Sequence, residues 1–498
     1  MSNRAAPVVT LLPLDDRPVN TSHVAALATA AGTRLRVPPA HLLPPRGVPA
    51  DPDRLTRWLE DSANDSDAVV VSVNQLVYGG YVASRRTTQP PAPALARLDP
   101  LRRIRAARPA TRIHAFMTLM RTKQANGADT EPDYWDRHGL DFFALSRETY
   151  RAEHGRANNV AAARTRIPAP LVTDFFTRRM RLHATQLACL DLVTDGVVDV
   201  LSILVEDSTM DSVSTTEREW LETWIRRLDL GDRVRCLPGA DEAGAVLTTR
   251  AALEHANLRP KVAVDCVDRQ ALERVAAYED VPVGDTITAQ LASIGADLVE
   301  SVEEADLVLA VHPPGVRPGD WYRRPDGTER ATGANTALAG RIGDHLRAGR
   351  PVAVADVADA NGADSALVAA LRDADLLQHL AGYAGWNTAG NSIGSVLAQG
   401  CARLLATGEA RIAAHRRAVT HRLVEDWGYQ TCARRAVITA GTAGRRGQVA
   451  RELNERLSEL GALADEFHVV PDSVHFPWGR AFEIDFELDH RRTGDRRP

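Results

Sequence analysis

Residues 8–20 read Val-Val-Thr-Leu-Leu-Pro-Leu-Asp-Asp-Arg-Pro-Val-Asn, an apolar run that ends in two acids, an arginine and an amide. The apolar part predicts a buried strand, because it is rich in aliphatic and β-branched residues. In open sheets of parallel strands, ligands bind at the carboxyl ends of the strands. We therefore expect Asp15, Asp16, Arg17 and Asn20 to face a ligand.

A structural role is the alternative for this turn. Residues 21–31 predict a helix that Gly32 stops, so Asn20 or Thr21 can cap the helix and Asp16 can favour its positive end. A cap needs only one acceptor, however. Two acids and an arginine together favour a binding or catalytic role.

Short runs rich in Val, Ile and Leu recur along the chain between segments of helical length. We expect strands at residues 8–12, 68–73, 113–119, 198–205, 262–264, 307–311 and 352–355. Strands that alternate with helices, without hairpin signals, indicate a mainly parallel sheet covered on both faces. The predicted class is α/β, with two Rossmann-like lobes and a helical C-terminal part; an elaborated (β/α) barrel is the alternative.

The length of 498 residues exceeds that of one ordinary core. We expect an N-terminal α/β lobe at residues 1–236, a second α/β lobe at 237–407, and a helical segment at 408–490 that closes on the cleft. Residues 481–486 resemble a strand within that last part, and residues 491–498 read as a disordered tail.

Composition excludes several classes of protein. The chain is 44% hydrophobic and 25% charged, as globular proteins are, and its formal net charge of -5 gives no general attraction for nucleic acid. No run is long enough to span a bilayer and no secretion signal is evident, so we expect a cytoplasmic protein without a membrane partner. The oligomeric state is left open.

Metal and redox motifs are also missing from the sequence. The five cysteines form no Cys-x-x-Cys pair, and His114, His312 and His421 have no metal-ligand spacing. No cofactor is predicted, although a divalent ion with oxygen ligands remains an alternative.

Polar groups follow two more strands in the N-terminal half. Asn74, Tyr78 and Arg85 flank a pair of glycines after the second long strand, and they suit hydroxyl or anionic ligands. Asp207 follows the strand that ends at Val205. Ser214 and Glu217, just beyond it, fit a capping box, so we expect Glu217 to be structural.

The same pattern recurs in the C-terminal half. Asp356 ends a strand, and Asn361 lies in the turn that follows it. Further along, the candidates are amide, aromatic and basic side chains: Trp386, Asn387, Trp478 and Arg480.

Several of these motifs together resemble an uncharacterised bacterial domain-of-unknown-function family that opens with this strand and an Asp-Arg-Pro turn. The resemblance covers almost the whole chain and rests on residues 13–20, 78–85, 238–242, 356–364, 383–388 and 477–483. This chain departs from the pattern at Asn74, where the family has aspartate, and at Glu206, where it has the first of two aspartates. The resemblance implies no known activity.

Carboxylates, amides, arginine and tryptophan are the groups that sugar-binding sites use. The sequence therefore predicts a hydrolase that acts on a small polyhydroxylated substrate, such as a glycoside or modified sugar, through paired carboxylates. We expect Asp16 or Asp207 as general acid and Asp15 or Asp356 as base or nucleophile, with the seven groups Asp15, Asp16, Arg17, Asn74, Asp207, Asp356 and Asn387 converging on one cleft. A metal-dependent hydrolase, isomerase or lyase and a non-catalytic metabolite-binding protein are the alternatives.

The variants Asp15→Asn and Asp16→Asn separate function from helix capping. A proton-transfer role predicts a loss of turnover on the order of a hundredfold, with stability unaltered or raised because crowded carboxylates repel each other. A capping role predicts a loss of about 1 kcal/mol or less of unfolding free energy and unchanged turnover of the folded fraction. Melting curves measured alongside turnover of each variant decide between these results.

Overall fold

The structure is a computed structural model that describes residues 6–323 and 332–491. Contacts divide the chain into two compact units. The first unit contains the chain up to Asp16, then Arg34–Ala251 and Tyr278–Val281. The second contains Arg17–Thr33, Ala252–Ala277 and the chain from Pro282 onward. The chain therefore passes between the units five times.

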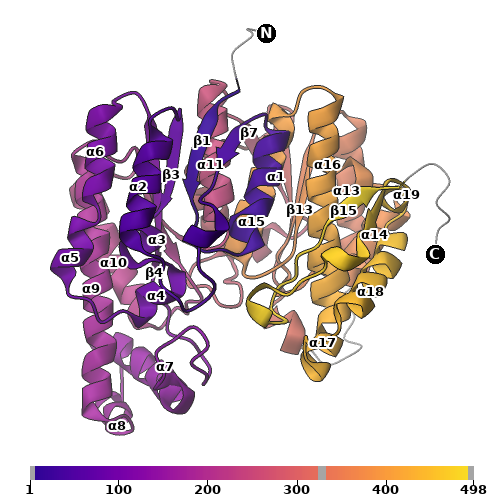
Figure 1. Ribbon diagram of the computed structural model, residues 1–498. Coiled ribbons are helices and arrows are strands. Elements are labelled where there is room, and N and C mark those ends of the chain that lie inside the picture. The colour runs from indigo at the N-terminus through magenta and orange to yellow at the C-terminus, as the bar shows by residue number, and fades with distance from the viewer. Residues whose placement is uncertain (1–5, 324–331, 492–498) are drawn as a thin grey trace. The chain divides into compact units, whose positions relative to one another are not determined.

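The first unit is built on a sheet of six parallel strands. Their order is β2 (Arg34–Arg36), β1 (Val8–Leu12), β3 (Ala68–Ser72), β4 (Arg112–Leu119), β5 (Val200–Val205) and β6 (Val234–Pro238). All residues of β1, β3 and β5 are buried, as expected for a parallel sheet covered on both faces. In Figure 1 β1, β3 and β4 lie side by side.

Amphipathic helices cover this sheet. Leu55 and Leu59 of α2 (Pro52–Ala63) share one apolar core with Val69 and Val71 of β3. Other helices of the unit include α3 (Val73–Tyr78), α4 (Tyr81–Arg86), α5 (Pro91–Ala96), α6 (Asp99–Ala107), α7 (Trp135–Glu153), α8 (Val160–Thr165), α9 (Ala169–Thr194) and α10 (Val213–Arg227). Apolar positions three or four residues apart on a helix bury one stripe, which explains this packing.

The second unit contains an open sheet of five parallel strands. Their order is β13 (Gly382–Ala384), β11 (Val352–Asp356), β9 (Leu307–His312), β7 (Lys261–Asp265) and β8 (Asp297–Val299). Its main helices are α12 (Val283–Ile294), α13 (Thr332–Arg347), α14 (Ser365–Asp373), α15 (Ala389–Leu405) and α16 (Glu409–Leu423).

Alternation along β11 places helices on both faces of this sheet. Val352 and Val354 belong to the apolar core that contains Ile342 of α13 and Leu367 of α14. Ala353 faces the other way, where it lies 3.3 Å from the position that a Cβ atom on Gly400 of α15 would take. Successive residues of a strand point to opposite faces, so one five-residue strand serves two helical layers.

The two sheets share one topology. Numbered from their own first strands, both have the order 2-1-3-4-5, and the first sheet adds a sixth strand at its edge. This is the flavodoxin-like order of doubly wound folds, in which ligands bind where the strand order reverses. The reversal lies between β1 and β3 in the first unit and between β7 and β9 in the second.

The segment after β1 belongs to the second unit. Helix α1 (Ser22–Ala30) packs against α15 and α16, so residues 17–33 contribute to a core whose other elements come much later in the chain. Gly32 has a φ of +74°, which confirms the predicted glycine stop.

A long π-helix, η6 (Val424–Ala433), joins α16 to α17 (Arg434–Ala440). The chain ends in α18 (Arg446–Ser458), α19 (Ala462–Glu466) and the antiparallel pair of β14 (Phe467–Val469) with β15 (Leu488–His490). The strand predicted at residues 481–486 is wrong: apart from one bridge at Asp485, pairing begins only at Leu488.

The predicted α/β class is confirmed, and all seven predicted strands are present. Both large sheets are open, so the structure does not have the alternative barrel. The boundaries 1–236, 237–407 and 408–490 remain a prediction, and the predicted tail lies outside the described residues except for Arg491. Among the described helices, none is both long and apolar enough to cross a membrane.

The close packing at the end of α3 can be tested by substituting Gly79. Its φ is +77°, and a Cβ atom there would lie 2.4 Å from the carbonyl oxygen of Ala50. Gly196, at the end of α9, has a φ of +71° with open space around the same position. Gly196→Ala should cost about 1–2 kcal/mol of unfolding free energy for the left-handed conformation alone.

Gly79→Ala should cost a further 1–3 kcal/mol or so, because backbone atoms must move to relieve the overlap. Chemical denaturation of both variants measures the difference. Equal losses would show that the contact between Gly79 and Ala50 is not tightly packed.

Candidate functional site

The predicted site residues are divided between the two units. Asp15, Asp16, Asn74, Tyr78, Arg85 and Asp207 lie in the first unit, whereas Arg17, Asn20, Asp356, Asn361, Trp386, Asn387, Trp478 and Arg480 lie in the second. The convergence of both sets on one cleft therefore remains a prediction. Each set is described within its own unit.

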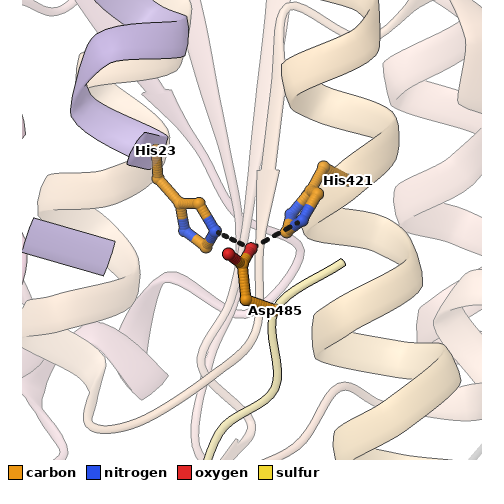
Figure 2. Close-up of side chains that lie close together, drawn as sticks. All are labelled: His23, His421 and Asp485. Carbon is orange, nitrogen blue, oxygen red and sulfur yellow. Dashed lines mark hydrogen bonds and ion pairs between the residues drawn. The ribbon is translucent and has the colours of Figure 1, made fainter. Parts of the chain in front are cut away.

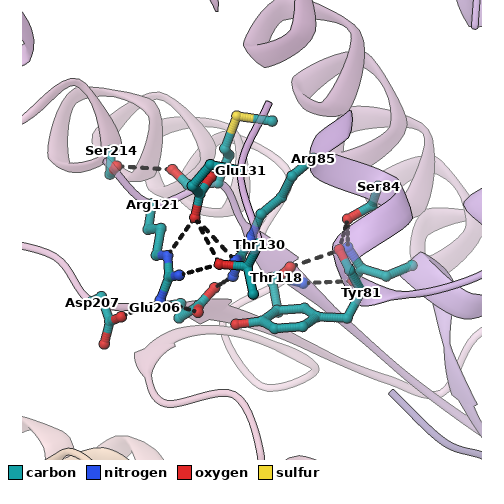
Figure 3. A network of polar contacts seen from close by, with 12 residues as sticks. Tyr81, Ser84, Arg85, Thr118, Arg121, Thr130, Glu131, Glu206, Asp207 and Ser214 are labelled. Atoms are coloured by element: carbon teal, nitrogen blue, oxygen red, sulfur yellow. Dashed lines mark hydrogen bonds and ion pairs between the residues drawn. The ribbon is translucent and has the colours of Figure 1, made fainter. Parts of the chain in front are cut away.

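In the first unit, a network of buried charges gathers beyond the carboxyl ends of β4 and β5 (Figure 3). Arg85 pairs with Glu131 at 3.2 Å and with Glu206. Arg121 pairs with Glu131 at 2.9 Å, with Glu206 at 3.0 Å and with Asp207. Two guanidinium groups thus face three carboxylates, and each buried charge has an opposite partner.

Two members of this network, Arg121 and Glu131, were not predicted from the sequence. Nearby arginines hold the pKa of Glu131 below its usual range although burial opposes them, and Glu131 in turn helps to raise the pKa of Arg121. Arg85 and Asp207 belong to this set of ion pairs. Their structural role is therefore as well supported as a ligand-binding role.

Asn74 and Tyr78 are held by neighbours in the same unit. The Asn74 amide donates to Ser84 at 3.0 Å and to Thr118 at 3.1 Å, and it accepts from the Thr118 backbone at 2.9 Å. The Tyr78 hydroxyl lies 2.7 Å from that of Thr185, and burial raises the pKa of Tyr78 to about 12. These bonds tie α3 to β4 and α9.

Asp15 and Asp16 follow β1, beside the point where the strand order of the first unit reverses. Asp15 is buried and Asp16 is half-buried. Their place in the sheet is the one expected for ligand-contacting loops.

Glu217 has a structural role, but the predicted capping box is wrong. Helix α10 begins at Val213, and its cap is Ser212, which accepts from the Thr215 backbone at 3.2 Å. Glu217 instead binds Arg179 through two contacts of 2.7 Å. The sequence offers two serines within three residues, and tertiary packing selects the first.

In the second unit, Asp356 ends β11 with a fully buried carboxyl group. Its Oδ2 accepts from the Tyr383 hydroxyl at 2.8 Å and from the Asp364 backbone at 2.7 Å. Its Oδ1 is buried and has no hydrogen-bond partner among the described residues. Burial is the main reason that the pKa of Asp356 rises from 3.8 to about 6.

Asp364 orients the loop that follows Asp356. Its side chain caps α14 through the Ala366 backbone at 2.9 Å and contacts His312 Nε2 at 2.9 Å. Asp364 is therefore the N-cap residue of α14.

A second carboxyl group, Asp426, was missed in the sequence. It is fully buried in the π-helix η6, accepts from the Gly385 backbone at 2.8 Å and pairs with Arg422. Gly385 also adjoins Asp356, because a Cβ atom on it would lie 3.4 Å from that of Asp356. Residues 424–433 show no sequence signal for a π-helix, a rare element that is found frequently at functional sites.

Burial raises the pKa of Asp426, while the positive charge of Arg422 opposes this effect. Asp356 lacks such a cation among its hydrogen-bond donors, which are a phenol and a peptide group. The two neighbouring carboxyl groups thus have different environments. Asp426 is the one that an adjacent guanidinium stabilises in its ionised form.

Aromatic and basic side chains adjoin this pair. The Trp386 ring lies 5.4 Å from that of Phe482 and 5.6 Å from the Arg422 guanidinium. Trp478 contacts both Arg17 and Arg480, whose guanidinium groups each lie 4.8 Å from its ring centre. The second unit therefore brings together four of the predicted residues: Arg17, Trp386, Trp478 and Arg480.

Backbone conformation marks several of the predicted positions. Asp207, Asn361, Asn387 and Trp478 have positive φ values of 38°, 62°, 68° and 56°. Asp and Asn adopt this conformation readily, but a bulky Trp seldom does, and such strain tends to occur at functional sites.

The Asn361 backbone donates to the Asn387 carbonyl at 2.9 Å, so these two predicted residues are neighbours. Asn20 is buried and donates its backbone N–H to Arg17.

A cluster of metal-ligating side chains is also present in the second unit. His23, His421 and Asp485 come from three distant segments and lie within reach of one ion (Figure 2). Their positions in the sequence are too far apart for any spacing motif, which explains why sequence analysis did not find them.

The family model of DUF4127, described as a protein of unknown function, matches residues 9–487. The chain belongs to the DUF4127 family. This confirms the predicted membership of an uncharacterised family. No curated protein matches the chain.

Asp356→Asn tests the environment of the buried carboxyl group. An asparagine can keep its oxygen toward Tyr383 and place its NH2 group at the position of Oδ1. Because the folded pKa of about 6 exceeds 3.8, folding favours the protonated form. The contribution of Asp356 to the unfolding free energy is thus complete below pH 4 and is lost as the pH rises through 6.

The unfolding free energy of the variant should equal that of the wild type near pH 4 and exceed it by up to about 3 kcal/mol at pH 8. Denaturation curves between pH 4 and pH 8 measure this difference. Asp51→Asn, the same change at an exposed helix cap, is the control and should not exceed the wild type in unfolding free energy at pH 8. A constant difference between Asp356→Asn and wild type would contradict the raised pKa.

Proposed function

We propose that this protein is a hydrolase that acts on a small polyhydroxylated substrate, such as a glycoside or modified sugar, through paired carboxyl groups. The observation that carries the proposal is the Asp356 side chain. One of its oxygens is fixed by two donors and the other is buried without a partner among the described residues. A buried carboxyl group with a pKa of about 6 is suited to donate a proton near neutral pH.

The neighbouring carboxyl group completes the pair. Asp426 is ion-paired with Arg422, which favours its ionised form against the effect of burial, and we assign it the role of partner to Asp356 as the acid. Environments that push two such groups apart assign the acid and the base in glycosidases. Asp356 then acts as general acid, opposite to the role expected for it in the sequence, and Asp426 acts as base or nucleophile.

Substrate recognition is proposed for the aromatic and basic groups of the same unit. The faces of Trp386 and Trp478 suit the apolar side of a sugar ring, and arginines suit vicinal hydroxyls or an acidic substituent. Arg17 and Arg480 both contact Trp478, so the side chain proposed to stack on the sugar ring lies beside those proposed to bind its polar groups. Asn361 and Asn387 add amide groups to the same unit.

Turnover of a panel of chromogenic glycosides tests the proposal. Asp356→Asn and Asp426→Asn should each lower kcat on the order of a hundredfold or more, since each removes a proton-transfer or nucleophilic group. Asp51→Asn should retain wild-type turnover. Activity of the wild type should fall as the pH rises through about 6, because Asp356 must be protonated to act as the acid.

The alternatives give other results in the same assay. Chelator-sensitive turnover in samples that circular dichroism shows to be folded would favour a metal-dependent enzyme. Melting shifts with sugars, but without turnover, would favour a metabolite-binding protein. Turnover that survives in both carboxyl variants would overturn the proposed roles.

A further inference from the structure

His23, His421 and Asp485 form a cluster that the proposed acid–base pair does not use. His23 lies on α1, His421 on α16, and Asp485 in the segment before β15. The Nε2 atoms of both histidines point at the same carboxylate oxygen, Oδ1 of Asp485 (Figure 2). All three side chains are between 14% and 18% exposed, so small solutes can reach them while most of their surface is covered.

Hydrogen bonding alone explains this arrangement incompletely. His421 Nε2 lies 3.0 Å from the Phe486 carbonyl as well as 3.5 Å from Asp485. His23 Nδ1 is buried and has no hydrogen-bond partner among the described residues.

The distances fit a tetrahedral ion. Zinc bonds of about 2.0–2.1 Å to nitrogen and oxygen place neighbouring ligand atoms about 3.3–3.4 Å apart in a tetrahedron. Asp485 Oδ1 lies 3.3 Å from His23 Nε2 and 3.5 Å from His421 Nε2. All three ligand atoms lie within 4.8 Å of one another, so the side chains can hold an ion if the two histidine nitrogens move to tetrahedral spacing.

The surroundings hold the two rings in place. The His421 ring stacks on Phe486 at 4.1 Å and meets the His23 ring edge-on at 4.6 Å. His421 Nδ1 lies 3.9 Å from Glu425 Oε2, which is too long for a hydrogen bond but places a carboxylate on the side where metal-binding histidines usually have one.

We propose that His23, His421 and Asp485 bind a divalent transition-metal ion, with Zn²⁺ preferred. Two imidazoles and one carboxylate favour zinc over Mg²⁺ or Ca²⁺, which select oxygen ligands. Three protein ligands leave a fourth position for water or for His475, whose Nε2 lies 3.7 Å from Asp485 Oδ2. The ion would join α1, α16 and the C-terminal segment within the second unit.

Zinc titration of the purified full-length protein, stripped by chelator and dialysed, tests this site. Calorimetry should show one tight equivalent of Zn²⁺, and the melting temperature should rise with Zn²⁺ concentration because the folded state binds the ion. Co²⁺ should give the intense visible absorption of a tetrahedral site. Mg²⁺ should produce neither effect.

His23→Gln and His421→Gln should each weaken Zn²⁺ binding at least a hundredfold and abolish the Co²⁺ spectrum. His154→Gln is the matched control: it also removes an imidazole that faces a carboxylate, Glu219 at 2.8 Å, and should bind Zn²⁺ as the wild type does. Circular dichroism without metal checks that each variant folds. If a variant fails to fold, the wild-type Co²⁺ spectrum still decides.

Absence of stoichiometric Zn²⁺ binding to the wild type would overturn the proposal. Wild-type Zn²⁺ affinity in both His23→Gln and His421→Gln would also overturn it. These readouts are independent of turnover. Failure of the metal site therefore leaves the acid–base proposal untouched, and the reverse also holds.

Discussion

The free-energy cost of burying the Asp356 carboxyl group determines how the candidate site of the second unit holds its proton. A carboxylate without a cation among its hydrogen-bond donors is expensive in a protein interior, so the group keeps its proton to a higher pH than usual. Tyr383 and the Asp364 backbone fix its Oδ2 and thereby orient the loop that caps α14. A stability cost of this kind is typical of residues that are kept for function.

Buried charge is handled differently in the first unit. Arg85 and Arg121 together meet three carboxylates, and the arginines hold Glu131 in its ionised form. A network of matched ion pairs beyond the sheet edge can orient loops. Asp207 is ion-paired with Arg121, and our proposal therefore assigns the proton-donor role to Asp356.

The sheets could be predicted because their signals are local. Buried parallel strands such as residues 352–356 read as short apolar runs, and Asp356 stands where such a run ends. Asp426 could not be predicted, because its position depends on a π-helix whose sequence looks helical throughout. The metal-ligating cluster was hidden for another reason: His23 and Asp485 are separated by most of the chain, and only the passage of residues 17–33 into the second unit brings them together.

The central claim is most directly tested by a ¹³C NMR titration of the Asp356 carboxyl carbon in the full-length protein, assigned by the loss of its signal in Asp356→Asn. Our account predicts an apparent pKa near 6, well above the usual 3.8 of an aspartate. A value near 4 would contradict it, because the carboxyl group would then already be ionised at pH 6, where the account requires a large protonated fraction to act as the proton donor.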